Sequence, residues 1–314
     1  MAVEAATNER LYRMNDRATI RLLPDGRRLH LNDGPIDLII GADGPAVELR
    51  RAYDAAAERF LTVLDELCDE LLVIRSRVRL GSLPPAGPIA RKMFESVFPY
   101  RDRCFITSMA AVAGAVAETI LSVMVETASL RRAYVNNGGD IALHLSPGES
   151  YTVGMVERPD HLSLFGSVEI SAAAPVRGIA TSGWRGRSFC LGIADAVTVL
   201  AATASQADAA ATIIANEVDL PNHPAITRIP ANEIAPDSDL VDLPVTRAVD
   251  ALSKSEIVQA LDAGAAAAEQ LRAQNLIHAV ALCLQGEVRL VSEPLTFLPV
   301  PNTTRTSERR SCLA

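Results

Sequence analysis

The segment that most constrains the fold is residues 109–118, which read Met-Ala-Ala-Val-Ala-Gly-Ala-Val-Ala-Glu. Thr107 and Ser108 precede it and can cap a helix that runs to about residue 130. A helix that is apolar on all sides has to be buried, and small side chains let its neighbours come close. Glu118 interrupts the run. It is either a helix-face residue that reaches solvent or a functional carboxylate at the wall of a site.

The composition is typical of a globular chain with a large core. The 314 residues are 49% hydrophobic but only 4% aromatic, so alanine, valine, leucine and isoleucine must fill the interior. A net charge of -8 argues against a nucleic-acid partner, which would need a basic surface. The only lysines are Lys92 and Lys254, and neither lies in a phosphate-loop or Schiff-base motif. Arginine must therefore supply any recognition of phosphate or carboxylate.

Cysteine usage and the N-terminus predict a cytoplasmic protein. The cysteines are scattered and form no Cys-x-x-Cys pair, which indicates reduced thiols. The first residues have neither a basic nor an apolar region of a signal peptide. The apolar runs are broken well short of the roughly 18 residues that a membrane span needs. We therefore expect no membrane partner. A homo-oligomer or a protein partner stays open.

Hairpin signals dominate the order of the predicted elements. We expect strands at residues 18–23, 28–31, 36–40, 132–135, 141–145, 151–156, 162–170, 178–181, 195–202, 275–284 and 288–291. We expect helices at residues 43–71, 91–97, 109–130, 205–217 and 253–274, with a long surface excursion over residues 219–244. The interleaved elements predict an α+β fold with a mixed, largely antiparallel sheet packed with helices.

One compact domain is expected to contain nearly all of these elements. We place it at residues 18–298, after an N-terminal arm at residues 1–17. Residues 299–314 are polar and charged, which predicts a flexible C-terminal tail.

Two interpretations fit the segment Asn137-Gly138-Gly139-Asp140. An Asn-Gly pair between apolar runs favours a hairpin turn. Alternatively, the glycines expose amide groups that approach a phosphate or ribose, and Asp140 bonds a hydroxyl.

Residues 177–218 combine groups that could bind an anion. Thr181, Ser182 and Gly183 end a strand and could donate hydroxyl and amide hydrogen bonds, or form an ordinary turn. Arg185 and Arg187 follow on a flexible segment that is either solvated or faces the anion. Asp195, which opens the next strand, is a structural partner of an arginine or a further site carboxylate.

Asp208 and Thr212 are four residues apart on the helix predicted to begin at Ser205, so their side chains share a face. Their oxygens are hard ligands that suit Mg²⁺. With Ser205 as the cap, however, Asp208 would be the third helical residue, where an acid completes a capping box. Capping and metal binding are both compatible with the spacing.

The motifs occur in an order that resembles an uncharacterised bacterial and archaeal family related to ApbE, the FAD:protein FMN transferase. The ordered set is residues 108–118, 135–141, 178–183, 194–199 and 207–212, and the resemblance covers roughly residues 20–295. Residues 184–193 are shorter than the matching ApbE segment, and Ala113-Gly114-Ala115 replaces a lysine-bearing segment.

The resemblance implies an ApbE-like fold with a cleft for FAD or FMN. Gly138, Gly139 and Asp140 match the Gly-Gly-Asp segment that lines the cleft in that family. Thr181, Ser182 and Gly183 match its Thr-Ser-Gly turn. Asp208 and Thr212 match the Asp-x-x-x-Thr pair that supplies Mg²⁺ ligands.

Three functions follow as hypotheses. The first is a cleft for a flavin or adenine nucleotide, or another anionic small molecule, with Mg²⁺-assisted transfer chemistry. The second is a non-catalytic accessory or assembly protein in sulfur or amino-acid metabolism. The third is a small-molecule enzyme without a nucleotide, in which Glu118 or Asp195 acts as acid or base.

Overall fold

The computed structural model describes residues 17–158, 161–292 and 297–299. Most of the predicted arm (1–17) and of the predicted tail (299–314) therefore lies outside the described residues. Arg17 is held by Asp33, whose side chain is only 1% exposed, through a 2.6 Å hydrogen bond from Nε to Oδ1. Pro299 is the last residue of strand β14. The boundaries of the predicted domain, 18 and 298, stay a prediction.

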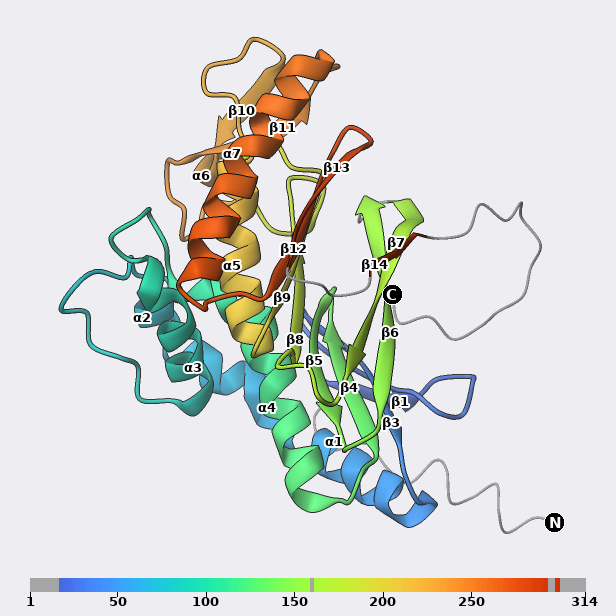
Figure 1. Ribbon diagram of the computed structural model, residues 1–314. Helices are drawn as coiled ribbons and strands as arrows, with labels where there is room; N and C mark the ends of the chain where they lie inside the picture. The colour runs from blue at the N-terminus through green and yellow to red at the C-terminus, as the bar shows by residue number, and fades with distance from the viewer. Residues whose placement is uncertain (1–16, 159–160, 293–296, 300–314) are drawn as a thin grey trace.

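Nine of the described strands form one sheet in the order β1-β2-β3-β4-β5-β8-β9-β12-β13 (Figure 1). They are β1 (Thr19–Leu22), β2 (Leu29–Asp33), β3 (Ile36–Asp43), β4 (Arg132–Asn137), β5 (Asp140–Leu145), β8 (Gly178–Ser182), β9 (Ala196–Ala201), β12 (Ala279–Leu284) and β13 (Glu287–Ser292). Every neighbouring pair in this sheet is antiparallel. The predicted α+β class is confirmed, and the described sheet is more uniformly antiparallel than the mixed sheet expected.

Helices cover one face of this sheet and a smaller sheet covers part of the other (Figure 1). The longer helices are α1 (Ala46–Asp69), α3 (Pro88–Val97), α4 (Val112–Thr127), α5 (Ala204–Glu217) and α7 (Lys254–Ala273). Short helical turns are α2 (Leu71–Ile74), η2 (Phe98–Tyr100), η3 (Ser108–Ala111) and α6 (Ala231–Ile234). The smaller sheet contains β6 (Ser150–Arg158), β7 (His161–Ser171) and β14 (Phe297–Pro299).

Strand alternation divides the apolar residues into two cores. On β9, Val197 and Val199 face the helices, whereas Leu200 faces the smaller sheet. On β5, Ala142 faces the helices, and Ile141 packs on the opposite side. Because side chains alternate along a strand, these positions also fix which face each polar neighbour occupies. Asp140 lies on the helix-covered face, in step with Ala142.

Helix α4 is the buried helix that the small-residue run predicts. Thr107 accepts a 3.2 Å hydrogen bond from the Met109 amide and caps a 3-10 turn, and α4 itself begins at Val112. Gly114 lies against the start of α5 so closely that a Cβ there would be 2.3 Å from the Ala204 carbonyl oxygen. No side chain fits at that distance, so the glycine is required by the helix crossing.

Two expectations about the second half of the chain are corrected. The cap of α5 is Thr203, whose side chain accepts a hydrogen bond from the Gln206 amide, and not Ser205. The excursion expected over residues 219–244 contains β10 (Ile226–Pro230) and α6, and β10 pairs with β11 (Pro244–Val249). The helix predicted over residues 253–274 is confirmed as α7, which begins with a capping box of Ser253 and Glu256.

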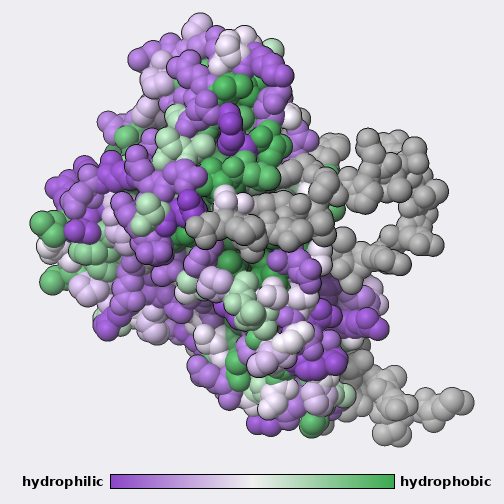
Figure 2. All heavy atoms as spheres, in the orientation of Figure 1, coloured by the Kyte–Doolittle hydropathy of each residue, from purple (hydrophilic) through white to green (hydrophobic). Residues whose placement is uncertain are grey.

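The helical segment Ser108–Thr127 is, among the described residues, long and apolar enough to cross a membrane, with a mean hydropathy of 1.8. Glu118 interrupts the apolar run within this segment, so the longest uninterrupted run is shorter than the helix. Its residues also serve the core, because Ala115, Val116 and Ile120 are fully buried. Hydrophilic residues cover most of the molecular face visible in Figure 2.

The close crossing at Gly114 predicts a large effect of one methyl group. Gly114→Ala gains helix propensity of roughly 1 kcal/mol, but the added carbon collides with backbone atoms that cannot move aside. We expect the variant to lose about 2–3 kcal/mol of unfolding free energy by overpacking. Urea denaturation measures this, with Ser122→Ala on the exposed side of α4 as the control. A variant as stable as the wild type would contradict the crossing.

Candidate functional site

The predicted Gly-Gly-Asp segment forms the tight turn between β4 and β5. Asn137 pairs with Asp140 across the hairpin, and Gly138 and Gly139 have positive φ angles of 65° and 115°. The side-chain carbonyl of Asn136 accepts a 2.8 Å hydrogen bond from the Gly139 amide. The hairpin interpretation is therefore confirmed. Positive φ at both turn positions explains the glycines without a ligand.

The same hairpin is tied to the N-terminal end of α4. The Asn137 side chain donates a 3.2 Å hydrogen bond from Nδ2 to the Ala113 carbonyl. From the other side, Oδ2 of Asp208 on α5 accepts a 3.0 Å hydrogen bond from the Gly114 amide. Three elements distant in sequence therefore meet at residues 113–114.

The interpretation of Asp208 as a capping acid is wrong. With Thr203 as the cap, Asp208 lies five residues further along, beyond the first turn of α5. Its carboxylate accepts the amide of another helix instead of an amide of its own. The half-buried Thr212 lies one turn later on the same face.

Asp140 and Asp208 form a pair of interacting carboxyl groups. Burial raises the pKa of Asp140 to about 7, against the opposing effects of the Thr181 amide and the Arg187 charge. The Thr181 amide donates a 3.2 Å hydrogen bond to Oδ1 of Asp140. Burial, followed by repulsion from Asp140, raises the pKa of Asp208 well above its usual value. The pair is stabilised when a proton or a cation reduces its combined negative charge.

The two predicted site arginines have different surroundings. Arg187 is exposed, and its Nη2 lies 3.2 Å from the position of a Cβ on Gly138, so the guanidinium covers the hairpin turn. Arg185 donates a 2.5 Å hydrogen bond from Nε to Oδ1 of Asp195 and stacks 4.2 Å from the centre of the Trp184 ring. Arg187, rather than Arg185, is therefore the arginine beside the acid pair.

Asp195 is a structural acid. It is 3% exposed, and its second carboxylate oxygen accepts a 2.6 Å hydrogen bond from the Gln285 amide. The Arg185 and Gln285 contacts leave it no access to a substrate. This removes Asp195 from the acid or base role in the third hypothesis.

The predicted Thr181-Ser182-Gly183 segment contributes mainly through its backbone. The Thr181 hydroxyl lies on the sheet face away from the helices, where it is 2.9 Å from the Thr198 hydroxyl. By alternation Ser182 lies on the helix-covered face. A Cβ on Gly183 would be 2.6 Å from the Asp195 carbonyl oxygen, so close backbone packing requires this glycine.

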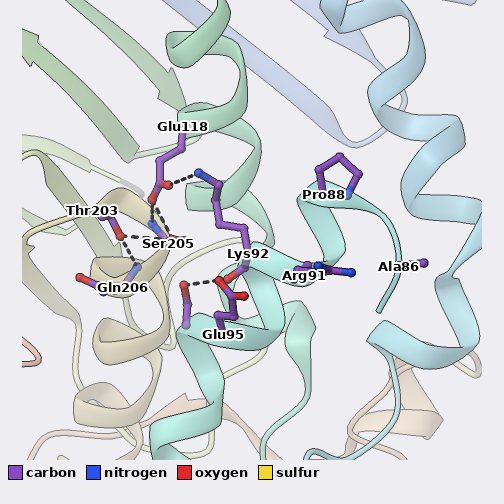
Figure 3. A pocket seen from close by; sticks show the side chains of 10 residues that line it. Ala86, Pro88, Arg91, Lys92, Glu95, Glu118, Thr203, Ser205 and Gln206 are labelled. Atoms are coloured by element: carbon purple, nitrogen blue, oxygen red, sulfur yellow. Dashed lines mark hydrogen bonds and ion pairs between the residues drawn. The ribbon is translucent and has the colours of Figure 1, made fainter. Parts of the chain in front are cut away.

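Lys92, Glu118 and Ser205 form a polar cluster that the sequence does not predict (Figure 3). Glu118 accepts hydrogen bonds from the Ser205 amide (2.6 Å), the Ser205 hydroxyl (2.7 Å) and Lys92 (2.7 Å). The Glu118 side chain is 13% exposed and lines a cavity, so it does not reach freely into solvent. The rarity of lysine in this chain was the available signal for Lys92, but no local spacing links it to residues 118 and 205.

The cluster borders a cavity of about 500 Å³ between α3, α4 and the start of α5. Polar and charged residues make up most of its lining, which consists of Ala86, Pro88, Arg91, Lys92, Glu95, Ser96, Glu118, Thr203, Ser205 and Gln206. The hairpin residues 137–140 are not part of this lining. Neither Asp140 nor Asp208 lines this cavity.

A family model described as "AbpE bacteria" matches residues 20–290. The chain belongs to this family. The sequence-based assignment to an uncharacterised ApbE-like family is thereby confirmed.

Archaeal UPF0280 proteins are similar over part of the chain. One from Methanothermobacter thermautotrophicus is 40% identical over 148 residues, which are 46% of this chain and 55% of the relative. One from Methanopyrus kandleri is 36% identical over 143 residues, or 46% and 54% of the two chains. The chain thus spans about half the length of these curated relatives.

A solved structure was also found, the apo form of the flavinyl transferase ApbE from Pseudomonas stutzeri. It covers 88% of this chain and 93% of its own, at 11% identity and a TM-score of 0.39.

The raised pKa of Asp140 predicts a pH dependence of stability. The unfolded carboxyl releases its proton near 3.8 and the folded one near 7. The folded state therefore holds the extra proton in between, and this contribution to stability is lost as the pH rises from about 4 to about 7. Asp140→Asn keeps the oxygen that accepts the Thr181 amide but does not ionise. Urea denaturation at pH 5 and at pH 8 measures how far the free energy of unfolding falls between the two. We expect this fall to be about 1–2 kcal/mol smaller in the variant than in the wild type. Equal losses in both proteins would contradict the assignment.

Arg185 and Arg187 are expected to contribute very differently to stability. Arg185→Met leaves the buried Asp195 carboxylate without its cation, which costs about 3 kcal/mol of unfolding free energy. Arg187→Met removes an exposed side chain and should change stability by less than about 0.5 kcal/mol. Chemical denaturation of both variants at pH 7 measures the difference. Equal losses would show that Asp195 does not depend on Arg185.

Proposed function

We propose that the chain binds the phosphates of a flavin or adenine nucleotide, or a comparable small anion, beside the Gly138-Gly139 turn, with Mg²⁺ held by Asp208. The observation that carries this proposal is the placement of two buried carboxyl groups, Asp140 on the Thr181 amide and Asp208 on the Gly114 amide, with repulsion from Asp140 contributing to the raised pKa of Asp208. Two adjoining carboxylates at one place cost stability unless a cation is present between or beside them. The family motif that implies a magnesium pair falls at that same place.

The donor set fits Mg²⁺. Asp208 and Asp140 offer carboxylate oxygens, and Thr212 offers a hydroxyl on the same helix face as Asp208. The described residues contain no group of three or more His, Cys, Asp or Glu side chains that could enclose a metal ion. A site with few protein ligands suits Mg²⁺, which keeps several waters and uses substrate phosphates as further ligands. Bound there, Mg²⁺ would neutralise charge on a reacting phosphate.

The other predicted residues take distinct roles in this proposal. Arg187 faces a phosphate over the turn and the Gly138 amide approaches it, while the Gly139 amide keeps the turn in shape through its hydrogen bond to Asn136. Asn137 and Ser182 hold or border the anion from the helix-covered side of the sheet. Arg185, Thr181 and Gly183 shape the segment without touching the ligand. No residue is assigned as nucleophile.

Chemistry at this site would be magnesium-assisted transfer of a phosphate-linked group, with FAD or FMN as the substrate class that the family relation favours. The non-catalytic accessory role is the alternative, and a stable protein partner purified with a ligand-free chain would favour it. The cytoplasmic location and the lack of a nucleic-acid partner stay predictions.

Titration of FAD, FMN and ADP by calorimetry, each with and without Mg²⁺, tests the proposal. We expect binding of at least one nucleotide to strengthen by tenfold or more with Mg²⁺, because the metal offsets the acid pair. Asp208→Asn should remove most of that magnesium effect. Glu126→Gln, an exposed acid at the far end of α4, should keep it. A folded wild-type protein that binds none of the three nucleotides under either condition would refute nucleotide binding.

A further inference from the structure

Asp208 of the candidate site lies on α5. The first turn of α5 binds Glu118 of α4, and Glu118 in turn binds Lys92 of α3. On α5, Ser205 and Asp208 are three residues apart and share a face. On α4, Gly114 and Glu118 are four residues apart and share the facing side. Ser205 contacts Glu118, and Asp208 contacts Gly114. The two contacts are consecutive along one helix crossing.

Glu118 makes the stronger of these contacts. One of its oxygens accepts both the amide and the hydroxyl of Ser205, and its other oxygen accepts the Lys92 ammonium from α3. The Glu118 side chain is 13% exposed and that of Lys92 is 35% exposed. Figure 3 shows Lys92 reaching across the edge of the cavity toward Glu118, with Ser205 on the opposite side. Hydrogen bonds to a charged and largely buried acceptor are stronger than neutral ones.

We infer that Glu118, itself held by Lys92, is a positioning residue that sets the Asp208 carboxylate against the Gly114 amide. Thr203 caps the Gln206 amide, and Glu118 from α4 accepts the neighbouring Ser205 amide. What Glu118 adds is a fixed direction for the first turn of α5 relative to α4. Asp208 lies within one turn of Ser205, so the direction of this turn determines where the Asp208 carboxylate points. The inference rests on the proposed function for its effect on the ligand, but its structural part stands without it.

The Gly114 amide reports this arrangement directly, because its hydrogen bond ends on Asp208. Nuclear magnetic resonance can follow its chemical shift and its hydrogen-exchange rate in each variant. Glu118→Ala removes the acceptor of Ser205. Glu118→Gln keeps an oxygen for the Ser205 amide and is the conservative variant. Arg91 lines the same cavity from an exposed position on α3, and Arg91→Met is therefore the matched control.

We expect Glu118→Ala to speed exchange of the Gly114 amide about tenfold relative to amides of β12, and to weaken magnesium-dependent nucleotide binding by about the same factor. Glu118→Gln should restore both to within about threefold of the wild type, and Arg91→Met should change neither. Unchanged Gly114 exchange in Glu118→Ala would overturn the inference. Lost Gly114 protection with unchanged nucleotide affinity would support the positioning of Asp208 by Glu118 and contradict the part that Asp208 has in nucleotide binding. If the wild type binds no nucleotide, the proposed function fails, and the Gly114 signal still decides whether Glu118 positions Asp208.

Discussion

The close approach of two helices at Gly114 is the constraint on which the rest of the structure depends. A residue with a side chain at this point would collide with the Ala204 carbonyl. With glycine there, the start of α5 lies directly on α4, and the Gly114 amide donates to Asp208 on α5. Asp208 and Glu118 then bind on either side of the contact. The small-residue helix is thus more than core filling, because it determines where the acids are.

The crossing also explains why an energetically unfavourable arrangement persists. Asp140 comes from the sheet and Asp208 from a helix, and each has local partners that hold it in place: the Thr181 amide for one and the Gly114 amide for the other. Among the described residues, the cation that offsets part of this repulsion is the exposed Arg187, which lowers the pKa of Asp140. Interacting acids with raised pKa values are frequent at functional sites. This is the physical reason to place the ligand there rather than in the polar cavity beside α3.

The sequence was sufficient for the features that depend on local pattern. The β4–β5 hairpin follows from Asn-Gly between apolar runs, and the start of α7 follows from Ser253 and Glu256. It was insufficient where two similar residues compete. Thr203 and Ser205 can both cap a helix, and only the distant Glu118 decides that Ser205 is used otherwise. Arg185 and Arg187 lie in the same short segment, and the distant Asp195 binds Arg185 but not Arg187.

Sheet geometry supplied the remaining correction. The face on which the Thr181 hydroxyl lies depends on the register of β8 with β9, and that register could not be read from the segment alone.

We propose that Asp140 and Asp208 together form a cation site. The most direct measurement is a crystal structure grown with Mn²⁺ and ADP, with an anomalous difference map. We expect a manganese peak bound to Asp208 and adjoining Asp140. A map with the nucleotide bound and no peak at Asp208 would contradict it.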